Sequence, residues 1–351
     1  MVHIAIVGAG VAGLAAAQVL KRRGVACTVY EKSRGVGGRA ATRTVAGVTF
    51  DHGAQYVKAP TADLERLFLE THAIDIERPV WVFNAAGTIR EGDPNQNADP
   101  KWAWEAGITA LSKAMAQGLD IRFEVQIDHL ELLSGQGGYR LLDAAGNNMG
   151  HADAVLLTPP GPQTAAIVAA STLLERFQVP LLTELQKVTY RRILAVSLLY
   201  AQRPTLPWYA LVNIDRRHPI SWVACEHDKP GHVPADHALL IAHMAHDFAT
   251  LHWDAAAQGT YGTSAQPLPT YVAESDRLVQ ALVGSDLGPP LWANVQRWGY
   301  ALPNAGADFE RLNDTRSGLY FAGDYTVGRG RVHEAIESGW HVAARIIADL
   351  L

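Results

Sequence analysis

The chain has 351 residues, of which 48% are hydrophobic and 19% charged, so it can bury a sizeable core and is not a disordered protein. A formal net charge of −5 argues against nucleic-acid binding, and two cysteines are too few for a disulfide framework. The length predicts two domains, or one large α/β domain with an insertion. No apolar run reaches the roughly 18 residues of a membrane span and no basic leader precedes a long apolar stretch, so we expect a cytoplasmic protein without a membrane partner.

The first elements predict a nucleotide-binding βαβ unit. An apolar strand over residues 3–7 leads into a glycine loop and an alanine-rich helix, and a second strand follows at residues 25–30. In such a loop Gly8 permits the tight turn, Gly10 lets a pyrophosphate approach the backbone, and Gly13 lets helix and strand pack closely. The phosphate charge then lies against backbone N–H groups at the helix N-terminus.

An acidic residue ends the second strand. Glu31 lies 18 residues past Gly13, where its carboxylate can accept hydrogen bonds from a ribose diol and repels a 2′-phosphate. A chance glycine turn is the alternative, but strand, helix and acid at this spacing favour a dinucleotide site. The predicted cofactor contacts in this region are Gly8, Gly10, Val11, Ala12, Gly13, Glu31 and Lys32.

A second glycine pair follows the acid. Gly37 and Gly38 permit another close backbone approach, and Arg39 can pair with the pyrophosphate from the other side. Nicotinamide dehydrogenases have no need of this second loop. An ordinary glycine turn beside surface arginines is the alternative interpretation.

The spacing of Glu31 and the Gly-Gly-Arg motif resembles the glutathione-reductase-type FAD fold of amine oxidases, phytoene desaturases and renalases. Residues 50–56, Phe-Asp-His-Gly-Ala-Gln-Tyr, are similar to the renalase-like variant within the flavin amine oxidase superfamily. The resemblance implies an α/β fold: a Rossmann-type FAD-binding domain with an inserted α+β substrate domain built on an antiparallel sheet. It also implies that Gln55 and Tyr56 lie beneath the flavin.

The C-terminal region carries a second part of the resemblance. An apolar strand over residues 317–322 ends at Gly323 and Asp324, and a helix begins at Val332. The resemblance implies that Asp324 contacts the ribitol or phosphate, and that the turn at Arg331 and Val332 presents N–H groups to the flavin ring. A positive helix end stabilises the negative charge of a reduced flavin. For Gly323 and Asp324, a plain strand-to-loop turn is the alternative.

The middle of the chain is predicted to alternate between the two domains. Residues 121–127 form an expected strand in which the resemblance implies backbone pairing of Val125 with adenine, and residues 188–243 hold the antiparallel strands. The predicted FAD-binding domain is discontinuous, with segments 1–57, 102–162 and 291–351. The predicted substrate domain comprises segments 58–101 and 163–290.

Substrate contacts are predicted from aromatic and histidine side chains. Trp298 and Tyr300 are candidates for the walls of a site beside the flavin, with Tyr56 and His243 as further catalytic candidates; Trp208 and Trp222 are weaker candidates. Six histidines lie between residues 227 and 252, but without a nearby cysteine they do not predict a metal site.

The expected chemistry follows from one departure from the family pattern. Amine oxidases of this fold typically keep a lysine that holds a water at flavin N5, and the corresponding strand, residues 191–200, has none. Residues 317–340 contain no cysteine, so FAD is expected to be non-covalent. The sequence predicts a renalase-like oxidase of dihydronicotinamide isomers of NAD(P)H, which transfers a hydride to flavin N5 and reduces O2 to H2O2. An amine oxidase and an FAD-binding protein without turnover are the alternatives.

Overall fold

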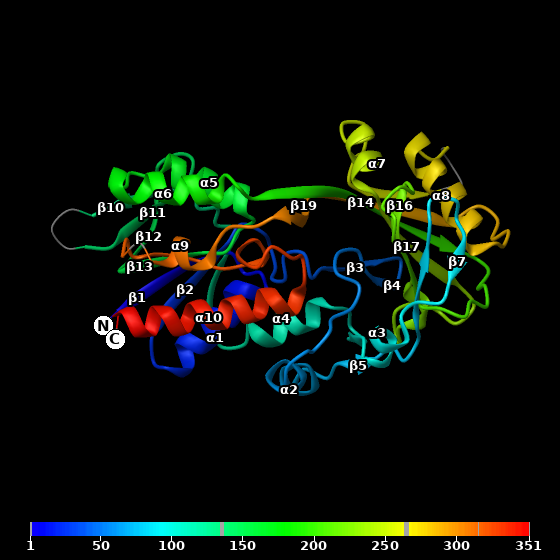
Figure 1. The fold of residues 1–351 in the computed structure, drawn as a ribbon, viewed down its shortest axis with the longest axis horizontal. Coiled ribbons are helices and arrows are strands. Elements are labelled where there is room, and N and C mark those ends of the chain that lie inside the picture. Colours follow the sequence, from blue (N-terminus) through cyan, green and yellow to red (C-terminus); the bar gives the residue numbers. More distant parts are fainter. Residues whose placement is uncertain (1, 134–136, 263–266, 315, 351) are drawn as a thin grey trace. The chain divides into compact units, whose positions relative to one another are not determined.

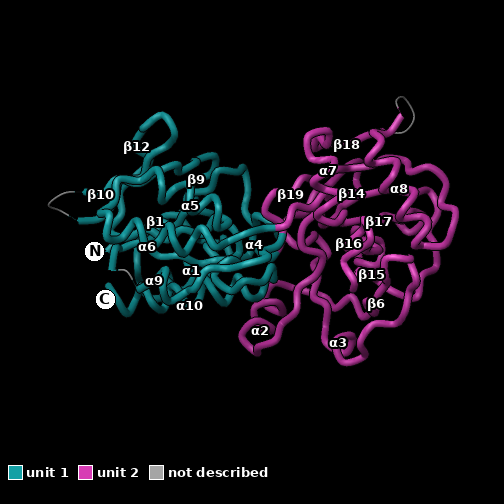
Figure 2. Tube along the Cα trace, turned by 45° about the horizontal axis from the view of Figure 1, so that its top comes forward, with its two compact units in different colours: residues 1–40, 111–190, 302–351 teal, residues 41–110, 191–301 magenta. Residues whose placement is uncertain are grey.

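A computed structural model describes residues 2–133, 137–262, 267–314 and 316–350. The chain divides into two compact units, coloured separately in Figure 2. Unit 1 comprises residues 1–40, 111–190 and 302–351, and unit 2 comprises residues 41–110 and 191–301. Residues 1 and 351, the ends of the predicted FAD-binding domain, lie outside the described residues.

Unit 1 is built on a parallel sheet of five strands in the order β20-β13-β1-β2-β9. Strands β1 and β13 are short and largely apolar because both faces of the sheet are covered, as parallel sheets require. This confirms the predicted Rossmann-type unit. The strands are β1 (His3–Val7), β2 (Ala26–Glu31), β9 (Asp120–Phe123), β13 (Ala154–Leu157) and β20 (Leu319–Phe321).

Helices cover both faces of this sheet (Figure 1). On one face α1 (Val11–Arg22) packs against α10 (Val332–Leu350), so closely that a Cβ at Gly339 would lie 2.2 Å from the carbonyl oxygen of Ala12. On the other face α5 (Gly161–Ala170) and α6 (Glu175–Leu185) bury apolar side chains against the strands. The remaining elements that lie wholly in this unit are β10 (His129–Leu132), β11 (Tyr139–Leu142), β12 (Asn148–Ala152), α9 (Phe309–Asn313) and the short η2 (Asp324–Thr326).

Unit 2 is built on a mixed sheet of eight strands in the order β18-β19-β14-β17-β16-β15-β6-β7. Strands β14, β16 and β17 pair antiparallel, as predicted, whereas β15 and β6 run parallel. The strands are β6 (Val80–Phe83), β7 (Ile89–Arg90), β14 (Thr189–Tyr200), β15 (Ala210–Asn213), β16 (Ile220–Cys225), β17 (Ala238–Met244), β18 (Gly259–Gly262) and β19 (Trp292–Ala305).

The two faces of the unit 2 sheet have different partners. One face packs against α7 (His246–Leu251) and α8 (Thr270–Val283) in a large apolar core. The other receives the hairpin of β3 (Thr42–Val45) and β4 (Val48–Asp51), whose Phe50 is fully buried. The other elements of unit 2 are α2 (Ala62–Glu70), β5 (Ile74–Asp75), α3 (Pro94–Ala98), β8 (Trp102–Ala103) and η1 (Glu226–Asp228). Helix α4 (Thr109–Met115) begins in unit 2 and continues in unit 1 from Leu111.

Two details of the sequence analysis need correction. The strand predicted at residues 121–127 ends at Phe123, because Glu124 takes a φ of +58°, which an extended strand does not allow. Residues 163–190, predicted in the substrate domain, lie in unit 1, because the apolar faces of α5 and α6 complete its core. Conversely, residues 41–57, 102–110 and 291–301 lie in unit 2. Among the described residues no helix is both long and apolar enough to span a bilayer.

Candidate functional site

The glycine loop between β1 and α1 has two kinds of glycine. A Cβ at Gly13 would lie 2.1 Å from the carbonyl oxygen of Gly8, and Gly8 itself has a φ of +104°, so the fold needs glycine at both positions. A Cβ at Gly10 would meet no atom within 4 Å, and its φ of −73° suits any residue. No side chain caps the N-terminus of α1 at Gly10. The chain therefore leaves open space beside unsatisfied helix N–H groups, as phosphate binding requires.

Glu31 lies at the end of β2 with both carboxylate oxygens engaged. Oε2 accepts from the backbone N–H of Ala9 and Oε1 from that of Ser33, each at 2.8 Å. Each oxygen keeps a second lone pair, so the predicted contact to a ribose diol stays chemically open. The neighbouring Lys32 is exposed, with its ammonium 3.5 Å from Oε1 of Gln163.

The second glycine loop lies directly against the first. The backbone N–H of Gly37 donates to the carbonyl of Ala9 at 2.9 Å, and a Cβ on Gly38 would lie 3.6 Å from Cα of Gly10. Gly38 has a φ of +58°, which favours glycine. The structure thus brings together the two loops that the sequence marks as approaching the pyrophosphate.

Two predicted cofactor residues pair with each other. Arg39 donates to both oxygens of Asp324, at 2.6 and 2.8 Å, although 285 residues separate them. Tyr190 donates its hydroxyl to the same carboxylate at 2.8 Å, and burial together with the charge of Asp324 raises the pKa of this phenol. Beside them the backbone N–H of Gly323 donates to Oγ of Ser338. A bidentate pair of this kind fixes the plane of the guanidinium group, so the group is already oriented for a phosphate.

Three further predicted contacts lie in unit 1. Val125 donates its N–H to the carbonyl of Glu31 at 3.0 Å, so its carbonyl, not its N–H, remains for an adenine. Helix α10 begins at Val332, directly after Arg331, as predicted. The first turn holds the partly buried Glu334, where burial raises the pKa of the carboxyl.

In unit 2 four of the predicted substrate residues, Tyr56, Trp222, His243 and Trp298, form an aromatic cluster together with His52, which was not predicted. The ring of His52 stacks on that of Trp298, with centroids 5.4 Å apart, and the indole N–H of Trp298 donates to the carbonyl of His52 at 2.8 Å. Trp222 and His243 are direct neighbours across β16 and β17, and the ring of Tyr56 lies 6.0 Å from that of Trp222. Tyr300, on β19 two residues after Trp298, is 36% exposed.

Polar atoms of this region are buried without partners. Nδ1 of His52, Oε1 of Gln55, Nε1 of Trp222 and Nε2 of His243 have no hydrogen-bond partner among the residues that the structure describes. Burial lowers the pKa of His52 and of His243 to about 4, so both rings are neutral near pH 7. Buried polar groups usually find partners, and four orphans in one region indicate a place for a ligand. His52 belongs to the motif at residues 50–56 but was not among the predicted site residues, because its stacking on Trp298 has no signal in the sequence.

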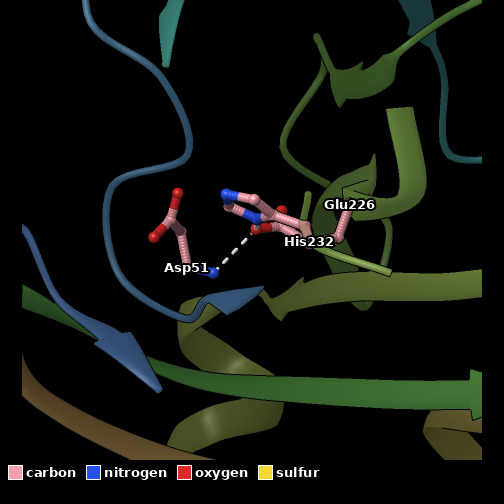
Figure 3. A group of neighbouring side chains, drawn as sticks. All are labelled: Asp51, Glu226 and His232. Atoms are coloured by element: carbon pink, nitrogen blue, oxygen red, sulfur yellow. Dashed lines mark hydrogen bonds and ion pairs between the residues drawn. The ribbon is translucent and has the colours of Figure 1, made fainter. Parts of the chain in front are cut away.

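A buried charge cluster lies next to this region. Asp51, Glu226, Lys229 and His232 have fully buried side chains. Figure 3 shows Asp51, Glu226 and His232, whose ligand atoms lie within 4.8 Å of one another, the one such group among the described residues. The ammonium of Lys229 lies 2.7 Å from Oδ2 of Asp51 and 3.0 Å from Oε2 of Glu226, so an organic cation already neutralises these carboxylates.

The other histidines between residues 227 and 252 are scattered. His227 lies against the carbonyl of Leu239, and Nδ1 of His246 accepts the backbone N–H of Arg192. His243 and His246 lie three residues apart in the sequence, but they form no metal-binding group within the described ranges. Trp208 is buried in the core on the helical face of the sheet, away from the predicted walls of a site.

Two family models match the chain. The model described as NAD(P)-binding Rossmann-like domain matches residues 6–71, and the model described as flavin containing amine oxidoreductase matches residues 85–347. A protein of Mycobacterium tuberculosis named "Putative flavin-containing monoamine oxidase AofH" is 48% identical over 62 residues, which are 18% of this chain and 13% of that protein. A 4,4'-diapophytoene desaturase of Staphylococcus haemolyticus is 49% identical over 57 residues, 16% of this chain and 11% of the desaturase. The chain thus matches only a small part of the length of these relatives.

Solved structures share the whole fold at low sequence identity. Cyclohexylamine oxidase from Brevibacterium oxydans superposes with a TM-score of 0.72 at 15% identity, covering 99% of both chains. Putrescine oxidase bound to putrescine gives a TM-score of 0.68 at 17% identity with the same coverage. These likenesses establish the two-unit architecture.

Proposed function

Since the chain belongs to the flavin containing amine oxidoreductase family, we propose that it binds FAD non-covalently and oxidises a hydride donor whose reacting ring is uncharged. Dihydronicotinamide isomers of NAD(P)H are the donors we expect, as for renalase-like enzymes. The observation that carries this proposal is the set of neutral, unpartnered hydrogen-bonding atoms on His52, Gln55, Trp222 and His243 in unit 2.

The residues of unit 1 suit the cofactor. Gly10 leaves the approach to the α1 N-terminus open, Glu31 offers lone pairs to a ribose, and Asp324 holds Arg39 in a fixed plane. The N-terminus of α10 at Val332 offers a second set of N–H groups. When bound, the flavin supplies a two-electron acceptor, so that a dihydronicotinamide, O2 and a proton give the nicotinamide cation and H2O2.

The unpartnered atoms of unit 2 match a carboxamide-bearing ring. The indole N–H of Trp222 can only donate and Oε1 of Gln55 can only accept, whereas a neutral imidazole can do either according to its tautomer. A carboxamide offers one acceptor oxygen and two donor hydrogens, which such a set can satisfy. The aromatic faces of Tyr56 and Trp298 provide flat apolar surface for the ring.

An amine is the second candidate, because the structures that share the fold include oxidases of cyclohexylamine and, in complex with it, putrescine. A buried ammonium needs an opposite charge or several acceptors. In unit 2 the carboxylates nearest the aromatic cluster, Asp51 and Glu226, are already paired with Lys229. These contacts therefore favour an uncharged reacting group over a cationic one beside the aromatic cluster.

The test is anaerobic reduction of the purified flavoprotein. The visible band of the oxidised flavin is followed after addition of 2-dihydro- or 6-dihydro-NAD(P), ordinary NAD(P)H, or a panel of amines. Fast bleaching by the dihydro isomers, with slow or no bleaching by the others, supports the proposal. Bleaching by an amine while the isomers are inert refutes it in favour of an amine oxidase, and a flavin that none of these reagents bleaches identifies a binding protein without turnover.

A further inference from the structure

Residues 51–56 carry two of the unpartnered side chains but little regular structure. After β4 ends at Asp51 the backbone runs through bends and irregular conformation as far as Tyr56. The shape of this recognition segment, residues 51–56, therefore depends on side-chain bonds. Gln55 makes one of them by donating its Nε2 to the carbonyls of Asp51 and Gly53.

Asp51 is the anchor of the recognition segment. Its Oδ1 accepts from Oγ1 of Thr42 at 2.6 Å and from the backbone N–H of Ile108 at 2.9 Å. Its own backbone N–H donates to Oε1 of Glu226 at 2.8 Å. Its second oxygen, Oδ2, accepts from the ammonium of Lys229 at 2.7 Å. The anchor thus joins a hairpin, the turn before α4 and the segment after β16.

Lys229 supplies the positive charge that contacts both Asp51 and Glu226. Its ammonium lies between Asp51 and Glu226, and Nδ1 of His232 lies 2.7 Å from Oε1 of Glu226 on the other side. Nε2 of His232 in turn lies 2.9 Å from the carbonyl of Trp104. Burial disfavours the charged forms, but the two carboxylates outweigh it and raise the pKa of both Lys229 and His232. Both ring nitrogens of His232 lie against oxygen acceptors, an arrangement that suits the doubly protonated, positively charged ring.

Without this ammonium the two buried carboxylates would face each other uncompensated. Removing one partner of a fully buried ion pair leaves an unpaired charge, and the structure around it must shift or admit water. Asp51 cannot move independently of its neighbours, because its carboxylate oxygens and its backbone N–H all form hydrogen bonds. Any displacement therefore passes directly to His52, the next residue.

We propose that Lys229 is a positioning residue: its buried ammonium takes the place that a divalent cation would take among Asp51, Glu226 and His232, and it fixes the recognition segment so that His52 and Gln55 meet the hydride donor. The contact of His52 and Gln55 with the hydride donor rests on the proposed function. The positioning of residues 51–56 by Lys229 does not, because it involves contacts within unit 2 alone.

The experiment compares Lys229→Met with Lys229→Arg, which keeps the charge, and with Tyr200→Phe. The last removes a hydroxyl of a buried side chain that donates to Asp276 at 2.6 Å on the opposite face of the same sheet, so it deletes one hydrogen bond to a carboxylate without touching residues 51–56. The first readout is the NMR resonance of the Trp298 indole N–H, which donates to the carbonyl of His52. The second is KM against kcat for the donor that reduces the wild-type flavin.

Lys229→Met is expected to shift the Trp298 resonance and to raise KM about tenfold, as loss of one buried hydrogen bond to the donor would, while the bound flavin content is unchanged. Lys229→Arg should restore part of both effects, and Tyr200→Phe should show neither. Combining Lys229→Met with Gln55→Ala should raise KM no further than the larger single effect, because both act on one contact.

An unshifted Trp298 resonance in a folded Lys229→Met protein overturns the proposal, whatever KM does. If that variant does not fold, Glu226→Gln weakens the hold on both Lys229 and the Asp51 N–H and gives the same comparison. If the resonance shifts but no dihydronicotinamide reduces the wild-type flavin, the proposed function fails and the positioning role stands. The two failures are therefore distinguishable.

Discussion

Gly10 and Gly13 lie three residues apart in one loop, and the structure predicts opposite consequences for the same substitution. In Gly10→Ala the new methyl group meets no atom within 4 Å, and the φ of −73° is allowed for alanine. The weaker helix cap costs about 1 kcal/mol, and the stiffer unfolded chain returns about 0.4–1 kcal/mol. The free energy of unfolding of the apoprotein should therefore change by less than about 1 kcal/mol.

In Gly13→Ala the methyl carbon would lie 2.1 Å from the carbonyl oxygen of Gly8 and 3.1 Å from Oγ1 of Thr158. A backbone carbonyl cannot turn aside as a side chain can, so the loss should reach the upper end of the range for overpacking, about 3 kcal/mol. The expected effect on FAD binding is separate from the effect on stability. Gly10→Ala fills the space at the helix N-terminus, so it should weaken FAD binding at least about tenfold, or about 1.4 kcal/mol, in a protein that is still stable.

The assay is urea unfolding of the two apoproteins, followed by titration of each with FAD using quenching of flavin fluorescence. Wild-type affinity in Gly10→Ala would refute the placement of the phosphate at this loop. Equal loss of apoprotein stability in both variants would refute the distinction between a glycine that the fold needs and one that the ligand needs.

Three other expectations follow from the described contacts. Asp324→Asn should leave Arg39 with a neutral partner and lower FAD retention during gel filtration more than Arg345→Gln, which breaks an exposed ion pair; equal retention would contradict the role of the Arg39–Asp324 pair. His243→Phe should raise donor KM about tenfold with an unchanged flavin spectrum, and an unchanged KM would remove His243 from donor recognition. The pKa values of His52 and His243 are about 4 in the folded protein and about 6.5 when unfolded, so the folded state binds fewer protons between these pH values. The free energy of unfolding should be highest above about pH 6.5 and fall towards pH 4, by up to about 3 kcal/mol for each ring. Urea unfolding at several pH values measures this dependence, and a flat profile would contradict it.

The part of the molecule that the sequence predicts is the part built from neighbours in the chain. The loop of Gly8, Gly10 and Gly13 can be recognised in the sequence because its constraints act within a few residues, and the strand before it is a short, continuous apolar run. Arg39 and Asp324 were each predicted to contact the cofactor, but their pairing was not predicted, since no pattern in one sequence links positions 285 residues apart.

The charge cluster escaped the sequence analysis for a related reason. Asp51 and Lys229 are separated by 178 residues, and a lysine after a strand normally reads as a solvated surface residue. Its burial follows from how β4 and the segment after β16 meet, which is tertiary information. Likewise the neutral state of His243 follows from burial, which residue type alone does not reveal.

The strand order of unit 1 has a consequence for synthesis of the protein on the ribosome. Strand β20 (Leu319–Phe321) pairs with β13, which pairs with β1 (His3–Val7), so one sheet joins the first and the last strands of the chain. At about 5–20 residues per second, the ribosome needs roughly 15–60 s to make the intervening chain. Once β13 (Ala154–Leu157) has been made, one of its edges stays open until β20 follows, and α10 is missing from the face of α1 for the whole interval. The sheet of unit 1 is therefore complete only after residues 319–321 have been made, and we expect the proposed FAD to bind after translation rather than during it.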